Sequence, residues 1–212
     1  MNDGPRPLRR RGKEWRERIA ALVLLLPAAP VMLLCAAAIK LEAIVDRKAR
    51  GPVFFTEARI SRGRVIRMLK FRTLPAATLA SLDLSQPTHI ADLEQAGHLT
   101  RAGRLIRQWY LDELPQLFNI VKGDMFLIGT RPYPVGEYEA ELAKGITRKR
   151  DMPAGLVGLV QSHKGQLDVL DEVELDRVYW EAFKTYSAWR LFLLDLRILF
   201  RSAKVQAEHR GL

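Results

Sequence analysis

The chain has 212 residues, 48% of them hydrophobic, and a formal net charge of +10. This length is sufficient for one domain with a hydrophobic core, and the basic excess predicts a polyanionic partner: nucleic acid, an anionic membrane surface or a phosphorylated substrate. The single cysteine, Cys35, excludes an intrachain disulfide, and the four scattered histidines do not have the spacing of a zinc site.

An apolar run is the first element in chain order. Residues 19–39 contain no charged or strongly polar side chain, and as a helix they would be about 31 Å long, which is the thickness of a bilayer core. A cleaved signal peptide would normally have a shorter apolar region followed by a small-residue cleavage site, whereas a basic stretch follows here. We therefore expect a membrane anchor in residues 1–50.

Two features favour a re-entrant helical hairpin over a simple crossing. Pro27 and Pro30 lie in the middle of the run, where each removes a backbone donor and bends a helix, so we expect them to form the membrane break. Residues 1–18 carry seven Lys/Arg against three Asp/Glu, and residues 40–72 carry ten against three. Because positive flanks stay in the cytoplasm, both ends are expected on the cytoplasmic face. The alternative is one proline-kinked crossing.

Residues 51–212 are expected to form a small cytosolic domain of the α/β class, mainly helical. The β-prone segments in residues 51–73 flank the turn residues Ser61, Arg62 and Gly63, which predicts a β-hairpin. Residues 75–98 are polar and contain two prolines, which is typical of a loop with short helical pieces.

Two helices are predicted next. Thr100 is a suitable N-cap for a helix over 101–110, and a second helix is expected over 112–121, ending at Gly123. Residues 129–134 are expected to form a rigid loop.

The last third of the chain divides into a broken stretch and a helix. Three glycines and a proline make residues 151–166 too irregular for a regular element. Residues 171–203 are expected to form a helix in which aromatic and basic side chains mix. That composition favours an amphipathic helix at a membrane interface, and the alternative is a helix that buries its aromatic rings in the core.

Asp112 and Glu113 are the strongest candidates for chemistry. The predicted helix begins at Asp112, and a helix N-terminus stabilises carboxylate anions and attracts phosphate. Two adjacent carboxylates could hold Mg²⁺ together with substrate phosphates, and an aspartate can also attack phosphorus. The alternative is that Asp112 is an ordinary N-cap.

Basic residues near this pair are candidates for phosphate binding. Lys70 and Arg72 lie two apart at the end of a predicted strand and so on one face. Arg104 and Arg107 lie on the helix before the acidic pair, and Arg131 is held in the stiff loop, where a fixed guanidinium suits phosphate. The alternative for each is a solvated surface charge.

The motifs taken together resemble those of the bacterial sugar transferases, the monotopic phosphoglycosyl transferases, over about residues 15–204. The length resembles that of the minimal members, which lack extra transmembrane helices. The motifs that carry the resemblance are Lys70-Phe71-Arg72-Thr73, Gly103-Arg104, Leu111-Asp112-Glu113-Leu114-Pro115-Gln116-Leu117-Phe118-Asn119, Lys122-Gly123-Asp124-Met125, Gly129-Thr130-Arg131-Pro132 and Glu174-Leu175-Asp176.

The resemblance implies a chemistry for these positions. Asp112 would attack the β-phosphate of a UDP-sugar with Glu113 as its partner, Mg²⁺ would neutralise the phosphates, and Arg131 would bind phosphate. Undecaprenyl phosphate, or a related polyprenyl phosphate, would then accept the sugar phosphate at the cytoplasmic face of the bacterial inner membrane. This would be the first membrane step in making an exopolysaccharide, a capsule, a lipopolysaccharide O-antigen or a glycoprotein glycan.

The sequence departs from the family pattern in several places. Ala29 precedes Pro30 where the family often has serine, and Thr130 replaces a proline. Residues 154–158 lack the family's proline and threonine, and Ser162-His163-Lys164-Gly165 replace its usual Asn-Gly-Arg region. The intact Asp112-Glu113 pair predicts activity, while the loop changes predict altered specificity. One alternative is an inactive scaffold. Another is a membrane-tethered nucleic-acid-binding protein, which we do not favour because no recognition-helix or zinc pattern is present.

Overall fold

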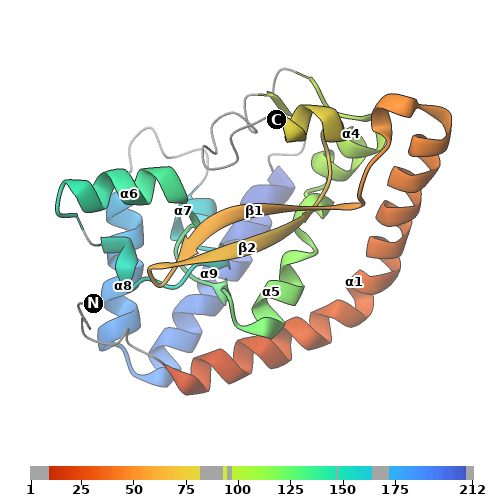
Figure 1. The fold of residues 1–212 in the computed structure, drawn as a ribbon. Coiled ribbons are helices and arrows are strands. Elements are labelled where there is room, and N and C mark those ends of the chain that lie inside the picture. Colours follow the sequence, from red (N-terminus) through yellow and green to blue (C-terminus); the bar gives the residue numbers. More distant parts are fainter. Residues whose placement is uncertain (1–9, 82–92, 95–96, 147, 164–171, 209–212) are drawn as a thin grey trace.

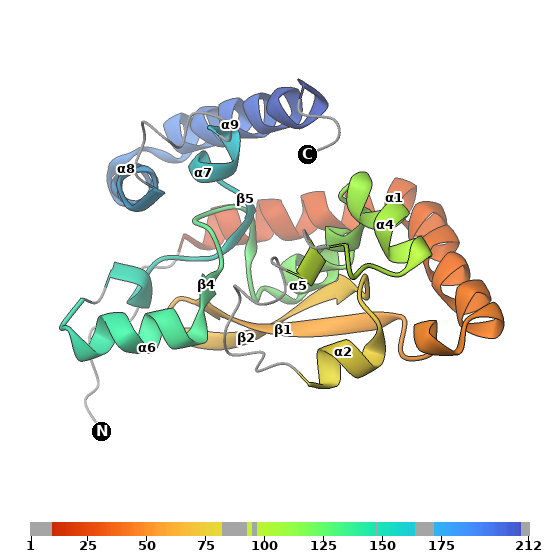
Figure 2. The ribbon, with the colours of Figure 1, turned by 90° about the horizontal axis from the view of Figure 1, so that it is seen from above.

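The computed structural model describes residues 10–81, 93–94, 97–146, 148–163 and 172–208, which form a mainly helical α/β fold. Figures 1 and 2 show the β-hairpin on one side, the C-terminal helices on the opposite side, and further helices between them. These layers are β1 (Phe54–Ser61) and β2 (Arg64–Phe71), then α1 (Arg11–Val45) and α5 (Gln116–Lys122), then α8 (Glu172–Thr185) and α9 (Ala188–Glu208).

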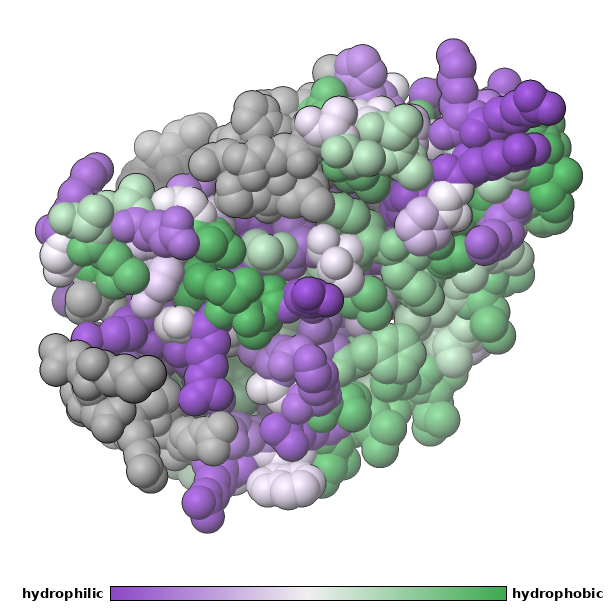
Figure 3. Space-filling view, in the orientation of Figure 1, coloured by the Kyte–Doolittle hydropathy of each residue, from purple (hydrophilic) through white to green (hydrophobic). Residues whose placement is uncertain are grey.

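Helix α1 contains the apolar run. Its most apolar 18-residue window has a mean hydropathy of 2.5 and is only 17% buried, and within the described part of the chain it is the one helix that is long and apolar enough to cross a membrane. Pro27 and Pro30 lie inside it, and Figure 1 shows the helix changing direction partway along its length. Figure 3 shows apolar surface over this helix. The structure thus has one bent helix here. Whether this helix enters and leaves a membrane on the same side, as expected for a re-entrant hairpin, depends on its placement in the membrane and stays a prediction.

The predicted β-hairpin is confirmed. β1 and β2 pair antiparallel from Phe54 opposite Phe71 to Ser61 opposite Arg64. Arg62 and Gly63 connect them with positive φ angles of 51° and 68°, the combination that a tight two-residue hairpin turn needs. A short strand, β4 (Tyr133–Pro134), pairs with β1 at the turn end of the hairpin.

Of the two short helices predicted in the middle of the chain, one begins where expected and the other begins later. Helix α4 (Arg101–Gln108) begins as expected, because the Thr100 side chain accepts a hydrogen bond from the Gly103 amide. The helix predicted over 112–121 begins later. A 3₁₀ turn, η2 (Leu111–Glu113), comes first, and α5 begins only at Gln116 because Pro115 is pre-organised for the first turn and needs no donor there. Gly123, with φ 89°, ends α5 as predicted.

A small parallel sheet corrects the expectation for residues 151–166. β3 (Phe126–Ile128) pairs with β5 (Gly155–Val157). A Cβ atom on Gly155 would lie 2.1 Å from the Gly129 amide nitrogen, so the two backbones meet at a distance that only glycine permits. The glycines that suggested an irregular loop therefore allow strand pairing instead.

The remaining short elements are η1 (Arg47–Ala49), α2 (Ala76–Ala80), α6 (Val135–Ala143), η3 (Arg148–Arg150) and α7 (Leu159–Ser162).

The single C-terminal helix expected over 171–203 is two helices, α8 and α9, with Tyr186 and Ser187 between them. Tyr179 and Phe183 are buried, whereas Trp189 is 65% exposed and Phe200 is 70% exposed. The core interpretation is therefore confirmed for Tyr179 and Phe183 in α8, and the membrane-interface interpretation stays a prediction for the exposed rings of α9.

A buried polar contact joins the two ends of the chain. Lys13, in the first turns of α1, donates to Asp195 of α9 over 2.6 Å, and the Tyr179 hydroxyl donates to the same carboxylate over 2.8 Å.

Candidate active site

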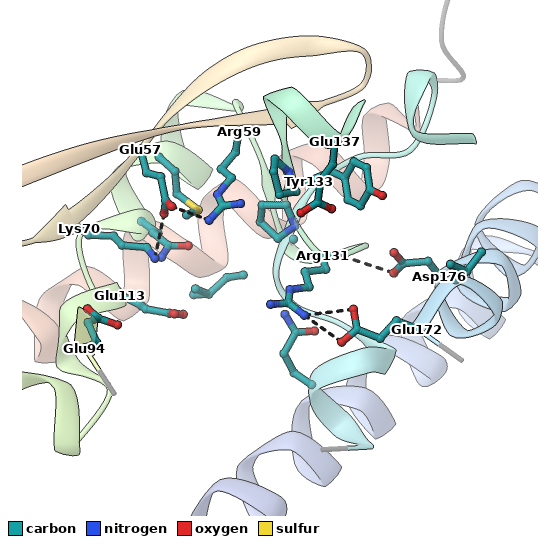
Figure 4. Close-up of a pocket in the computed structure, with 18 of the residues that line it drawn as sticks. Glu57, Arg59, Lys70, Glu94, Glu113, Arg131, Tyr133, Glu137, Glu172 and Asp176 are labelled. Atoms are coloured by element: carbon teal, nitrogen blue, oxygen red, sulfur yellow. Dashed lines mark hydrogen bonds and ion pairs between the residues drawn. The ribbon is translucent and has the colours of Figure 1, made fainter. Parts of the chain in front are cut away.

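A cavity of about 480 Å³ opens beside the hairpin and contains most of the charged candidates. Figure 4 shows Glu94 and Glu113 toward one end of it and Arg131 with Glu172 and Asp176 toward the other. Its walls carry both signs of charge. The carboxylates are Glu57, Glu94, Glu113, Glu137, Glu172 and Asp176, and the cations are Arg59, Lys70, Arg107 and Arg131.

The hairpin supplies one wall through alternate residues of its strands. Lys70 Nζ lies 3.1 Å from Glu57 Oε2, and Arg59 Nη2 lies 2.5 Å from Glu57 Oε1. Burial would raise the pKa of Glu57, but Lys70 and Arg59 outweigh it and lower that pKa. Burial likewise opposes the charge on Lys70, yet Glu57, Glu113 and Asp112 raise its pKa. Lys70 is therefore a half-buried cation held toward the acidic pair.

The acidic pair lies in the 3₁₀ turn η2. The turn follows Tyr110, whose left-handed conformation (φ 55°) reverses the chain after α4. Glu113 lines the cavity, whereas Asp112 lies behind it and is 2% exposed. Asp112 Oδ1 is buried and has no hydrogen-bond partner among the residues that the structure describes. A buried carboxylate oxygen without a donor is an unstable arrangement, which points to a cationic or phosphoryl group that completes it.

The electrostatic expectation for Asp112 was wrong in direction. A helix N-terminus would have favoured its ionised form, but α5 begins four residues later. Burial first, and the charge of Glu113 second, raise the pKa of Asp112 from 3.8 to about 6, although Arg107 and Lys70 act in the opposite direction. Asp112 is therefore mostly ionised at neutral pH, and its carboxylate is poorly solvated.

Arg107 connects α4 to the pair. Its Nη1 atom lies 3.4 Å from Asp112 Oδ2, and its Nε atom lies 3.1 Å from Glu94 Oε2. Glu94 also accepts a hydrogen bond from the Thr73 hydroxyl. Arg107 thus lines the cavity at the end where the acidic pair lies, as a phosphate-binding residue would.

Arg131 lies on the opposite side of the cavity, in the predicted loop. Its Nη1 atom is 2.9 Å and 3.1 Å from the two oxygens of Glu172, and its backbone amide faces Asp176 Oδ1 at 3.4 Å. Asp176 is fixed in turn by the buried Lys149, which also donates to the Arg131 carbonyl over 3.2 Å. These contacts hold the backbone of Arg131 in place. Its guanidinium, 57% exposed, forms an ion pair with Glu172 that an anionic ligand could replace.

Two predicted phosphate-binding residues lie elsewhere. Arg72 is 2% exposed and does not line the cavity. Its guanidinium donates to the carbonyls of Pro52, Leu74 and Ala49 at 2.7, 2.8 and 2.6 Å. The expectation that Arg72 shares the face of Lys70 fails because β2 ends at Phe71 and the chain turns. Arg104 is exposed on α4, away from the cavity.

Sequence reasoning also missed Glu57, Arg59 and Glu94. Glu57 and Arg59 were detectable in principle, because residues two apart in a strand share a face, and the predicted turn sets Glu57 opposite Met68. Glu94 follows a segment without a regular pattern, which offered no signal.

The carboxylates suit a magnesium ion only in part. Within the described segments, no group of three or more Asp, Glu, His or Cys side chains could form a complete metal site. Mg²⁺ usually takes one or two protein carboxylates together with substrate phosphates. Asp112 Oδ1, which no described residue contacts by a hydrogen bond, and the adjacent Glu113 meet that smaller requirement.

The chain is similar to several known proteins. The chain is 37% identical over 161 residues to galactosyl transferase CpsE of Streptococcus agalactiae serotype III, covering 72% of this chain and 36% of that protein. It is 33% identical over 197 residues to the undecaprenyl-phosphate glucose phosphotransferase of Komagataeibacter xylinus, covering 87% and 34%. It is 35% identical over 208 residues to the UDP-glucose:undecaprenyl-phosphate glucose-1-phosphate transferase of Caulobacter vibrioides, covering 92% and 71%.

The chain thus spans about a third of the length of the first two of these relatives. A model of one family, described as bacterial sugar transferase, matches residues 8–209. Because this match includes α1, the hairpin, the acidic pair and both C-terminal helices, the chain belongs to the bacterial sugar transferase family.

Proposed function

We propose that the protein transfers a sugar 1-phosphate from a UDP-sugar to undecaprenyl phosphate and releases UMP. The observation that carries the proposal is the buried Asp112 Oδ1 atom, which finds no hydrogen-bond partner within the described segments and lies beside a cavity lined by Lys70, Arg107 and Arg131. The Caulobacter relative is named for this reaction with UDP-glucose. The altered residues at 154–158 leave the choice of sugar to be measured.

In the first step, Asp112 attacks the β-phosphorus of the donor. A bond forms between a carboxylate oxygen and phosphorus, the bond from phosphorus to the bridging oxygen breaks, and UMP leaves with that oxygen. Asp112 is not on the cavity wall in this structure, so the proposal requires its side chain to turn toward the donor. Its poor solvation favours attack, because little water has to be removed from the carboxylate.

In the second step, the lipid phosphate attacks the same phosphorus and Asp112 leaves as a carboxylate. Splitting the transfer in this way means that the nucleotide sugar and the membrane lipid need not be bound at the same time.

The cationic side chains reduce the repulsion between two anions. Lys70 and Arg107 flank the acidic pair, and Arg131 approaches from the opposite wall, so all three can contact the diphosphate. Mg²⁺, when bound, would neutralise the phosphates. Asp112 and Glu113 would hold it, and Glu113 would also orient the phosphate.

Membrane placement completes the proposal. We infer that residues 1–50 anchor the chain as a re-entrant segment broken at Pro27 and Pro30, and that residues 51–212 form the catalytic part at the cytoplasmic face. Exposed apolar side chains surround the prolines on α1, including Leu26 (76%) and Leu33 (71%). The basic residues at both ends of α1 support placement of both ends on one side.

A labelling experiment tests the covalent step. The full chain in nanodiscs is incubated with Mg²⁺ and a radiolabelled UDP-sugar, without a lipid acceptor. UMP should appear at about one equivalent per active site, with label retained on the denatured protein. Asp112→Asn should show neither. Glu139→Gln is a matched control, because Glu139 is an exposed carboxylate on α6 that does not line the cavity, and it should label normally.

Two results would contradict the proposal in different ways. Normal turnover with lipid, but no UMP and no labelled protein without it, would mean direct attack by the lipid phosphate. Failure to turn over any UDP-sugar, even with lipid present, would favour the inactive scaffold.

A further inference from the structure

The membrane helix α1 meets α4, the helix that leads to the acidic pair, through packed apolar side chains and through the carboxylate of Glu42. We propose that Glu42 is a positioning residue that ties the membrane anchor to Arg107, and through Arg107 to Asp112. The proposal rests on the proposed function where it predicts changes in enzymatic activity. Its prediction for amide hydrogen exchange rests on the geometry of the helices alone.

Glu42 completes the N-terminal cap of α4. Its Oε1 atom accepts from the Arg101 amide over 2.7 Å, and its Oε2 atom accepts from the Ala102 amide over 2.8 Å. The Thr100 hydroxyl accepts from the next amide, that of Gly103, over 2.9 Å. The first three free N–H groups of α4 are therefore all satisfied by side chains, and two of the three bonds come from the membrane helix.

The cap fixes the position of α4 as well as its helicity. Both oxygens of one charged carboxylate are used, so the end of α4 cannot slide along α1 without losing a bond. The second half of α1 also packs on α4, because Met32, Cys35 and Ile39 share a buried cluster with Ala102 and Ile106.

Arg107 occupies the last turn of the same helix. With only eight residues, α4 has two turns, and a shift at its first turn is transmitted directly to its last. Arg107 contacts Asp112 at 3.4 Å, a distance at which a small displacement ends the contact. The connection from Glu42 to Asp112 therefore consists of one cap, one short helix and one ion pair.

Thr100 provides the matched control. It caps the same helix within the same turn, but it comes from the residue before α4 and makes no link to α1. Thr100→Ala removes a cap and leaves the attachment to the membrane helix, whereas Glu42→Gln removes the charge and one acceptor of that attachment. If Glu42 served only the stability of α4, the two variants would behave alike.

A double-mutant cycle in nanodiscs tests the proposal. Glu42→Gln should lower kcat/KM for UMP release about tenfold. It should lower kcat/KM by less than twofold when Arg107→Gln is already present, because the Arg107 guanidinium that links α4 to Asp112 is then already lost. Thr100→Ala should lower kcat/KM by less than about threefold, and its effect should multiply with that of Arg107→Gln. Glu42→Asp, which keeps the charge and both oxygens, should recover part of the loss.

Amide hydrogen exchange gives a readout that needs no turnover. Glu42→Gln should raise exchange across 101–113, whereas Thr100→Ala should raise it only in the first turn of α4. Multiplying effects of Glu42→Gln and Arg107→Gln, or exchange confined to the first turn in Glu42→Gln, would overturn the proposal. Absence of wild-type turnover would instead contradict the proposed function, and the exchange result would still decide the role of Glu42.

Discussion

Replacing Asp112 by asparagine should abolish transfer and stabilise the fold. The pKa of Asp112 is raised from 3.8 to about 6, mainly by burial. The folded chain therefore binds this proton more tightly than the unfolded chain does. The stability that the proton contributes is fully present below about pH 3.8 and is lost as the pH rises through about 6. At pH 8 the ionised carboxylate destabilises the fold by at most about 3 kcal/mol, relative to an unshifted group.

Asparagine is nearly the same size and carries no charge, so Asp112→Asn removes this penalty. It also removes the contact with Arg107, which offsets part of the gain. A net gain of about 2 kcal/mol should raise Tm by about 4 to 8 °C for a chain of this length.

Thermal unfolding in nanodiscs, without divalent cations, measures the difference. The gap in Tm between Asp112→Asn and wild type should be largest at pH 8 and should close as the pH falls below 5. Glu137→Gln, an exposed carboxylate at the same cavity, should show no gap. A variant less stable than wild type at pH 8, or a gap independent of pH, would refute the reasoning.

Three further predictions follow from other parts of the structure. Arg131→Lys should lower kcat/KM for UMP release by about tenfold, since lysine keeps the charge but not the planar donor group; near-normal turnover would make Arg131 an ordinary surface charge. Single cysteines at Gly12 and Lys48, in a Cys35→Ala background, should both be protected from an impermeant thiol reagent in intact cells; labelling of either from outside would establish a full crossing. Gly103→Ala should lower Tm severely, because its Cβ would lie 2.1 Å from a backbone carbonyl oxygen; an unchanged Tm would show that α4 can move.

Features determined by neighbouring residues could be predicted from the sequence. Thr100 caps α4, and Arg62-Gly63 turns the hairpin, because capping and turn geometry depend on residues within one turn of the chain. The acidic pair and Arg131 were likewise found as candidates, and both line or adjoin the cavity.

Features determined by tertiary contacts could not be predicted. Lys70 and Arg72 are equivalent in a strand pattern, yet one points to a carboxylate in the cavity and the other binds three carbonyls in the interior. The difference depends on where the chain goes after β2. The raised pKa of Asp112 likewise reflects burial by elements far apart in the sequence.

The buried contact between Lys13 and Asp195 has a consequence for biosynthesis. The two residues are 182 positions apart, and ribosomes add about 5 to 20 residues per second, so on the order of ten to forty seconds pass before the second exists. During that time the first turns of α1 are already made, but the ammonium group of Lys13 lacks its partner on α9. This ion pair can therefore join α1 and α9 only after the intervening 181 residues have been synthesised, so the contact forms late in the synthesis of this part of the chain.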